Sequence, residues 1–143
     1  MKKELTNRLV YEFPQFFRDI TKSPMETCMC WGCECGDGWF DILYDLCKKI
    51  EAINPPEDFK FCQVKEKMGG LRVYTVGCPE EVDRLVDEAQ RVSYKTCEEC
   101  GTQKDVISDW VSGWVRTICK SCAVNNFGPD IEKLWNPTEP SSD

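Results

Sequence analysis

The sequence predicts an α+β fold in which two amphipathic core helices pack on a β-hairpin, with a four-cysteine zinc ribbon toward the C-terminal end. Three observations lead to this prediction. Apolar residues recur at helical spacing in two stretches, a Gly-Gly dipeptide separates two strand-like runs, and two C-x2-C pairs stand eighteen residues apart. We expect an α+β core over 1–96, a zinc ribbon integrated with the core over 97–123, and a short helix with a solvated tail over 124–143.

Composition predicts a reduced, cytoplasmic protein. We do not expect an enzyme, because catalysis here would have to use carboxylates, a thiolate or lysine, and no pair of these has a spacing that nominates it. The eleven cysteines are an odd number, and the sequence begins with no secretory leader and has no apolar run of membrane-spanning length. A formal net charge of -7 and a pI of about 4.7 disfavour indiscriminate binding to nucleic acid. The absence of histidine excludes Ser-His-Asp and Cys-His catalysis and most catalytic zinc sites.

The first third of the chain predicts short helical pieces, a loop and then the first core helix. Residues 3–20 have apolar side chains at helical spacing, interrupted by Pro14, and we expect them to dock on the core. Residues 23–38 hold four cysteines among several glycines and predict an irregular loop. Residues 39–53 predict a helix with Asp37 as its N-cap and Asn54-Pro55-Pro56 as its stop. Its expected apolar stripe is Trp39, Ile42, Leu43, Leu46, Ile50 and Ile53.

Residues 59–76 predict two strands joined by a tight turn at Gly69-Gly70, a dipeptide that accepts positive φ angles. Because side chains alternate along a strand, this turn gives the hairpin one apolar and one basic face. The apolar face is Cys62, Val64, Met68, Leu71 and Val73, and the basic face is Gln63, Lys65, Lys67, Arg72 and Tyr74. The expected facing pairs are Met68 with Leu71, Lys67 with Arg72, and Lys65 with Tyr74.

The second core helix begins at Pro79, which suits a first helical position, and runs through residue 92. Its expected buried stripe is Val82, Leu85, Val86, Ala89 and Val92. It leads directly into the ribbon, in which residues 106–107 and 114–118 predict two strands. A further short helix is expected over 129–135.

Two C-x2-C pairs, Cys97 with Cys100 and Cys119 with Cys122, predict the ligands of one zinc ion. Four thiolates fill a tetrahedral coordination shell and leave no position for water or substrate. The expected role of this zinc is therefore structural.

A second group of cysteines precedes the first core helix. Cys28, Cys30, Cys33 and Cys35 lie within eight positions, and only Cys30 and Cys33 have C-x2-C spacing. They could bind a second metal ion or form a redox switch. Alternatively, some are small buried apolar residues, as free cysteine often is. We expect one zinc ion, with a second metal the less favoured interpretation.

The basic hairpin face is the best candidate for a ligand-binding surface. Like charges placed opposite each other on a hairpin favour an anion or an acidic partner between them. The alternative is a solvated strand face balanced by nearby acids. The candidate ligand-binding residues are Lys65, Lys67, Arg72 and Tyr74, joined by Arg116 and by Trp31 of the cysteine loop.

Several runs of the chain resemble a family of small proteins encoded by tailed phages. These runs are T-C-M-C-W-G at 27–32, G-D-G-W at 36–39, V-K-E-K-M-G-G-L-R-V-Y at 64–74, C-E-E-C-G at 97–101 and G-W-V-R-T-I-C at 113–119. The chain departs from the family pattern at three positions. Cys33 stands where members commonly lack a thiol, Met68 where many have a large aromatic residue, and Cys122 where some have histidine. The resemblance implies a virus-encoded protein that acts in a bacterial cytoplasm.

Two functions follow from these observations as hypotheses. The first is a non-catalytic accessory protein that binds and inhibits or sequesters a host component of bacterial defence. Its partner would be a host protein or an anionic small ligand, such as a nucleotide-type signalling molecule, bound at the basic face. In a homo-oligomer, this face could line a pocket between copies. The alternative is a zinc-ribbon module that contacts nucleic acid or the transcription or replication machinery.

Overall fold

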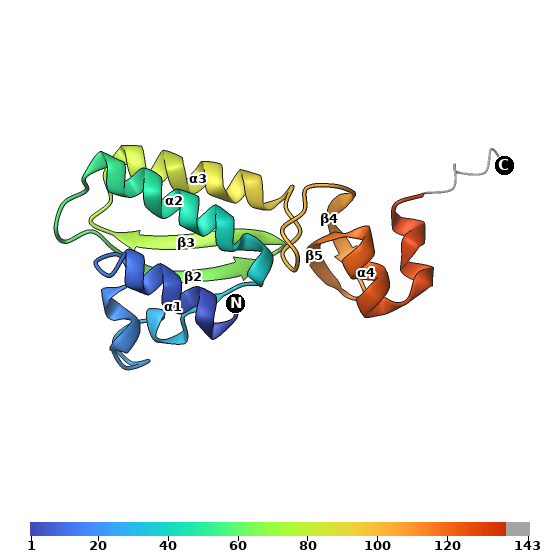
Figure 1. Cartoon of the computed structure of the whole chain (residues 1–143), viewed down its shortest axis with the longest axis horizontal. Coiled ribbons are helices and arrows are strands. Elements are labelled where there is room, and N and C mark those ends of the chain that lie inside the picture. The colour runs from blue at the N-terminus through green and yellow to red at the C-terminus, as the bar shows by residue number, and fades with distance from the viewer. Residues whose placement is uncertain (137–143) are drawn as a thin grey trace.

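The computed structural model describes residues 1–136 and confirms the α+β class (Figure 1). In Figure 1, α2 and α3 lie side by side across one face of the sheet that contains β2 and β3, and the ribbon with β4, β5 and α4 lies at the far end. The helices are α1 (Lys3–Glu12), α2 (Phe40–Ile53), α3 (Glu80–Ser93) and α4 (Lys120–Phe127). The strands are β1 (Cys33–Glu34), β2 (Lys60–Lys67), β3 (Gly70–Val76), β4 (Val106–Val111) and β5 (Trp114–Cys119).

The N-terminal segment packs on the core through aromatic side chains. Helix α1 ends at Glu12, two residues before Pro14, and a short 3-10 helix follows at Arg18–Thr21. Phe16 and Phe17 are buried, and their rings lie 5.7 and 5.0 Å from that of Phe61 in β2. The backbone N–H of Phe61 donates to the carbonyl of Phe16 at 2.9 Å. This segment therefore bonds to β2 at the edge of the strand that faces away from β3.

Helix α2 begins at Phe40, and the expected N-cap was wrong. Asp37 opens a 3-10 turn, and its carboxylate accepts a hydrogen bond from the backbone N–H of Lys2 at 2.6 Å. Asn54 ends the helix in the left-handed region at a φ of 57°. Of the expected stripe, Ile42 and Ile53 are only half-buried, while two unexpected residues, Phe40 and Cys47, are buried.

Helix α3 runs antiparallel to α2 in Figure 1, and its C-terminal end is anchored to the sheet. Pro79 is its N-cap and not its first residue, because its extended ψ of 155° is not helical. Val82 and Ala89 are its buried apolar residues. At the C-terminal end, the hydroxyl of Ser93 accepts a hydrogen bond from the backbone N–H of Leu71 at 2.9 Å. The end of α3 is thereby fixed to the start of β3.

The hairpin turn lies one residue earlier than the glycines predict. Lys67 pairs with Gly70, and the two turn residues are Met68 and Gly69, with φ of 52° and 80°. These angles correspond to a type I′ turn, the two-residue turn whose twist matches a hairpin. Lys65 consequently faces Arg72 and not Tyr74. Met68 is exposed in the turn and does not belong to the apolar face.

A bulge in β2 accounts for a second difference on the hairpin. The register shifts between Phe61 and Gln63, so that Phe61 becomes fully buried with Val64 while Cys62 is half-exposed. Cys62 therefore does not join the apolar face. On its other edge β2 pairs in parallel with the two-residue strand β1, a third strand that the sequence did not predict.

The ribbon has longer strands than predicted, and α4, which begins directly after Cys119, was not expected. The predicted helix over 129–135 is a 3-10 helix at Pro129–Leu134. Most of the predicted solvated tail, residues 137–143, lies outside the described residues. Within residues 1–136, no helix is both long and apolar enough to cross a bilayer.

We predict that Met68→Asn stabilises the protein. Asparagine tolerates the left-handed region that Met68 occupies, and Asn-Gly is the favoured pair in a type I′ turn. The free energy of unfolding in urea should rise by about 1 kcal/mol. Met68→Leu is the matched control and should leave it unchanged. An equal response to both substitutions would contradict the turn at Met68–Gly69.

Candidate metal centre

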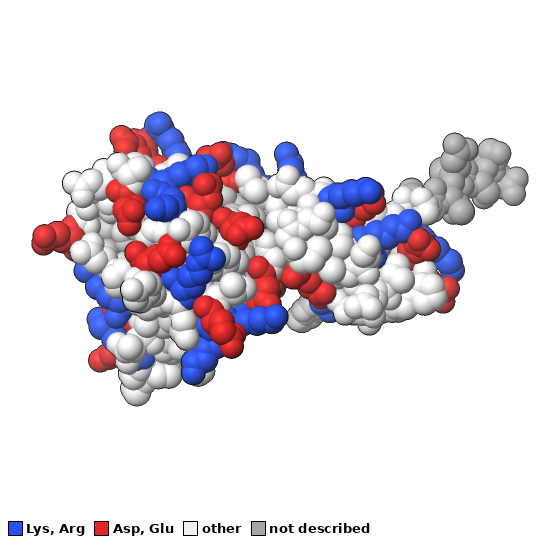
Figure 2. Space-filling view, viewed as in Figure 1, with Lys and Arg blue, Asp and Glu red and all other residues white. Residues whose placement is uncertain are grey.

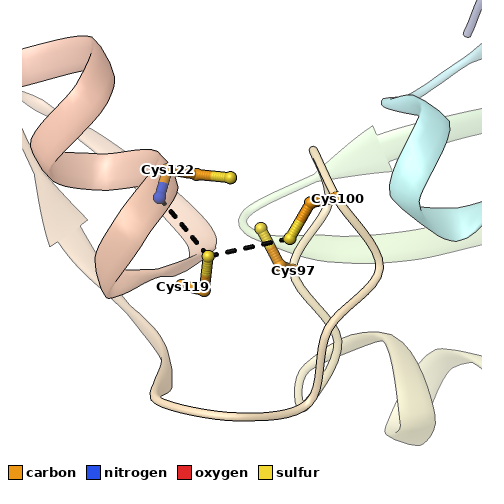
Figure 3. Close-up of side chains that lie close together, drawn as sticks. All are labelled: Cys97, Cys100, Cys119 and Cys122. Carbon is orange, nitrogen blue, oxygen red and sulfur yellow. Dashed lines mark hydrogen bonds between the residues drawn. The ribbon is translucent and has the colours of Figure 1, made fainter.

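Four cysteine side chains converge at the junction between the core and the ribbon. Cys97 and Cys100 lie in the loop after α3, Cys119 is the last residue of β5, and Cys122 lies in the first turn of α4 (Figure 3). Their sulfur atoms all lie within 4.8 Å of one another, and those of Cys100 and Cys119 are 3.7 Å apart. A tetrahedron of thiolates at about 2.3 Å from a central metal separates its sulfurs by about 3.8 Å. The geometry therefore fits a four-coordinate metal ion, and these cysteines could hold one.

Backbone hydrogen bonds shape the two Cys-containing turns. The N–H of Gly101 donates to the carbonyl of Cys97 at 2.9 Å, and Gly101 has the left-handed φ of 82° that this turn requires. A hydrogen bond from the backbone of Thr102 lowers the pKa of the Cys100 thiol. In the second turn, the N–H of Cys122 donates to Sγ of Cys119 at 3.4 Å. The N–H groups of Thr102 and Cys122 stabilise sulfur in its anionic form, the form that ligates a metal.

Burial opposes ionisation at two of the four thiols. It raises the pKa of Cys97 and that of Cys122. Thiolates at these positions need a nearby cation to offset the loss of hydration. A bound metal ion supplies that charge, so the set is better suited to coordination than to a free nucleophile.

The G-D-G-W run at 36–39 docks directly on the first Cys-containing turn. The N–H of Gly38 donates to the carbonyl of Glu98 at 2.8 Å, and the N–H of Gly36 donates to the Glu98 carboxylate at 2.9 Å. The indole N–H of Trp39, whose side chain is fully buried, donates to the carbonyl of Thr96 at 2.9 Å. The start of α2 is thus fastened to the residues that flank Cys97.

The turn of the core hairpin docks on the ribbon from the other side. The hydroxyl of Thr117 in β5 donates to the carbonyl of Gly69 and lies 2.8 Å from the Ser108 hydroxyl of β4. The N–H of Glu98 donates to the carbonyl of Thr117 at 3.0 Å. The four-cysteine group therefore lies where three segments distant in sequence meet: the G-D-G-W run, the hairpin turn and the ribbon.

Glu98, Thr117 and Gly36 were not among the sequence candidates. Their importance depends on packing between distant segments, which residue type does not reveal. The pair Gly36 and Gly38 was an available signal, since glycine, which has no Cβ, can mark a place where another backbone approaches closely. Burial raises the pKa of the Glu98 carboxyl even though Gly36 donates to it.

The second cysteine group does not converge. Within residues 1–136, the four cysteines at the junction are the one group of three or more potential metal ligands that come together. Cys28 is exposed and Cys30 half-buried, whereas Cys33 and Cys35 are buried in the core with Cys47. Burial raises the pKa of Cys33 to about 11 and raises the pKa of Cys35 and Cys47 as well. These three thiols stay protonated at neutral pH and act as small apolar residues.

The basic residues of the hairpin share one face, although their pairing differs from the expected one. Lys65 faces Arg72, and Gln63 faces Tyr74. Neither Lys65, Lys67 nor Arg72 forms an ion pair within the described chain. Arg72 donates to the Tyr94 hydroxyl at 3.1 Å. The facing pair of like charges therefore has no acidic partner that neutralises it.

Arg116 and Trp31 lie elsewhere. Thr117 points toward the hairpin turn, so its neighbour Arg116 points to the opposite side of the ribbon, where its guanidinium lies 4.9 Å from the centre of the Phe127 ring. Trp31 is 64% exposed in a 3-10 turn and borders a depression that Lys3 and Asn7 also line. No described contact joins either residue to Lys65 or Arg72.

Comparison with family models, with curated proteins and with solved structures found no match. What the structure defines is an α+β protein with a four-cysteine group that could hold a metal ion.

We predict that Gly38→Ala disrupts the junction. A Cβ at this position would lie 2.5 Å from the amide nitrogen of Gly101 and against the carbonyl oxygens of Cys97 and Glu98. Because these are backbone atoms that cannot rotate away, the free energy of unfolding should fall by about 3 kcal/mol. Urea denaturation measures the change.

Gly113→Ala is the matched control. Gly113 has a φ of 83°, and a Cβ added there would meet no atom within 4 Å, so this variant should lose about 1 kcal/mol from backbone strain alone. Equal losses in the two variants would show that the close approach of the G-D-G-W run does not matter.

Proposed function

We propose that this chain is a phage-encoded, non-catalytic zinc protein that binds and inhibits or sequesters a defence component of its bacterial host. The observation that carries the proposal is the four-thiol set at the junction. Its sulfur spacing suits tetrahedral coordination, and four protein ligands leave no open position for a reacting molecule. A closed site of this kind supports a scaffold that presents a binding surface.

Zinc is the metal we propose for this site. Thiolate-only tetrahedral sites favour zinc or iron, and a single metal with two C-x2-C turns is the usual arrangement of structural zinc. Such sites contribute on the order of 10 kcal/mol of apparent binding free energy. That is comparable with the whole stability of a domain of this size.

The proposed binding surface is the hairpin face that carries Lys65, Lys67 and Arg72. Two cations face each other there without an ion-pair partner among the described residues, and an anionic group placed between them would relieve their repulsion. A phosphate-bearing small molecule of the nucleotide type, or an acidic patch on a host protein, supplies such a group. Tyr74, which is 44% exposed on the same face, offers a flat apolar contact beside the charges.

A second candidate function is contact with nucleic acid through the ribbon. Trp110 and Trp114 are 62% and 66% exposed in β4 and β5, and exposed aromatic rings stack on unpaired bases. The overall acidity of the chain, with a net charge of -7, counts against this candidate.

We predict one zinc ion per chain and a ribbon that depends on it. Cys100→Ser should lower both the zinc content and the melting temperature, because one of the four ligands is lost. Cys28→Ser is the matched control, since Cys28 is also exposed but lies outside the group. Elemental analysis and thermal melting measure the two effects. A melting curve that Cys100→Ser leaves unmoved would argue against a structural metal.

We also predict that the protein recovered from phage-infected bacteria carries an anionic ligand or a host protein. Native mass spectrometry should show this extra mass on the wild type and not on the Lys65→Glu/Arg72→Glu variant, with zinc retained in both. Lys48→Glu/Lys133→Glu makes the same charge change at exposed positions elsewhere and should keep the extra mass.

Equal retention by both double variants would contradict binding at the hairpin face. A gel-shift series over salt concentration tests the second candidate, because phosphate contacts make affinity fall steeply with salt. Salt-dependent binding that Lys65→Glu/Arg72→Glu leaves unchanged would favour the ribbon as a nucleic-acid module.

A further inference from the structure

An apolar groove runs between α2 and α3. Its floor consists of Ile42 and Leu46 from α2 and Leu85, Ala89 and Val92 from α3, and its volume is about 220 Å³. These residues are spaced three and four apart along α2 and α3, which lie antiparallel in Figure 1. The groove that they line therefore follows the helix axes. The groove lies outside the metal centre and on α2 and α3, not on the basic hairpin face.

The dimensions of the groove favour side chains of a partner over a compact ligand. Small-molecule pockets usually enclose roughly 300–1,000 Å³, more than this groove provides. Its α2 wall extends from Asp41 to Lys49, which corresponds to about 12 Å of helix. Near the middle, the small side chain of Ala89 would allow another backbone to approach closely. An elongated apolar groove of this kind suits a helix that inserts a few side chains.

The rim of the groove is acidic. Asp41, Asp45 and Glu88 contribute carboxylates, against the single ammonium group of Lys49. Lys49 is already engaged, with its Nζ 3.0 Å from Asp45 and 4.0 Å from Glu88. Asp41 has no ion pair within residues 1–136, so one end of the rim carries an unbalanced negative charge. Figure 2 shows acidic and basic side chains interspersed over this part of the molecule, so the excess of negative charge is confined to the rim of the groove.

We propose that the α2–α3 groove docks an amphipathic helix of a partner protein, one whose apolar stripe is flanked by lysine or arginine. The apolar residues of that helix would cover Ile42, Leu85 and Val92, which are only partly buried in the free chain. Its cationic residues would pair with Asp41 and Glu88 at the rim. This surface is independent of the proposed anion site, so the protein has a second face through which it binds a macromolecule.

Two matched peptides test the proposal by nuclear magnetic resonance on the full chain. The first is a helical peptide of about 16 residues with leucine on one stripe and lysine beside it, and the second replaces every lysine with glutamate. The lysine peptide should shift the amide signals of α2 and α3 along the groove in a saturable way, and the glutamate peptide should not. Shifts that spread over the whole surface, or that centre elsewhere, would overturn the proposal.

Charge-reversed variants separate docking from general attraction to an acidic protein. Asp41→Lys/Glu88→Lys should weaken binding of the lysine peptide by about tenfold or more. Glu81→Lys/Asp87→Lys alters exposed acids of α3 outside the groove by the same charge and should weaken it less than about threefold. Circular dichroism would test whether both variants are folded. Equal weakening of peptide binding in the two variants would contradict the proposal. Self-association of the wild type that Asp41→Lys/Glu88→Lys abolishes would also contradict it, because the groove would then bind a second copy of this chain.

Discussion

The convergence of four thiols at one point is the constraint on which the rest of the structure depends. Glu98, inside the first Cys-containing turn, accepts hydrogen bonds from Gly36 and Gly38 and donates one to Thr117. Its position therefore sets where α2 begins and how the ribbon meets the hairpin turn. A metal ion that holds this turn closed would fix all three segments together, because each contacts backbone atoms that have little freedom to move.

The two apolar clusters of the chain differ greatly in what they can stabilise alone. The larger cluster includes Phe17, Trp39 and Phe61 and extends from α1 through the sheet to α3. The ribbon cluster has few fully buried residues, chiefly Val111, Ile118 and Ala123, beside two of the cysteines. A core that small supplies little hydrophobic stabilisation. The ribbon thus relies for its stability on its four-thiol group and on its contacts with the hairpin turn, whereas the larger part also has an apolar core of its own.

The candidate binding surfaces lie on opposite layers of the same body. The sheet presents Lys65 and Arg72 on the face away from the core, and the helical layer presents the groove rimmed by Asp41 and Glu88. One surface suits an anionic group and the other a cationic helix. Under the two binding proposals above, these faces would hold one partner each at the same time.

Local pattern alone determined several features of this protein. The spacing of Cys97, Cys100, Cys119 and Cys122 predicted the four-thiol group, because each C-x2-C turn is a local structure with a fixed shape. Apolar residues at helical spacing predicted α2 and α3, because the period of a helix is also a local property of the chain. Tertiary structure decided the rest: the turn at Met68–Gly69, the bulge beside Cys62, strand β1 and the burial of Cys33. Each of these depends on contacts between segments distant in sequence, such as the hydrogen bond from the Thr117 hydroxyl to the Gly69 carbonyl. Local propensity does not predict such contacts.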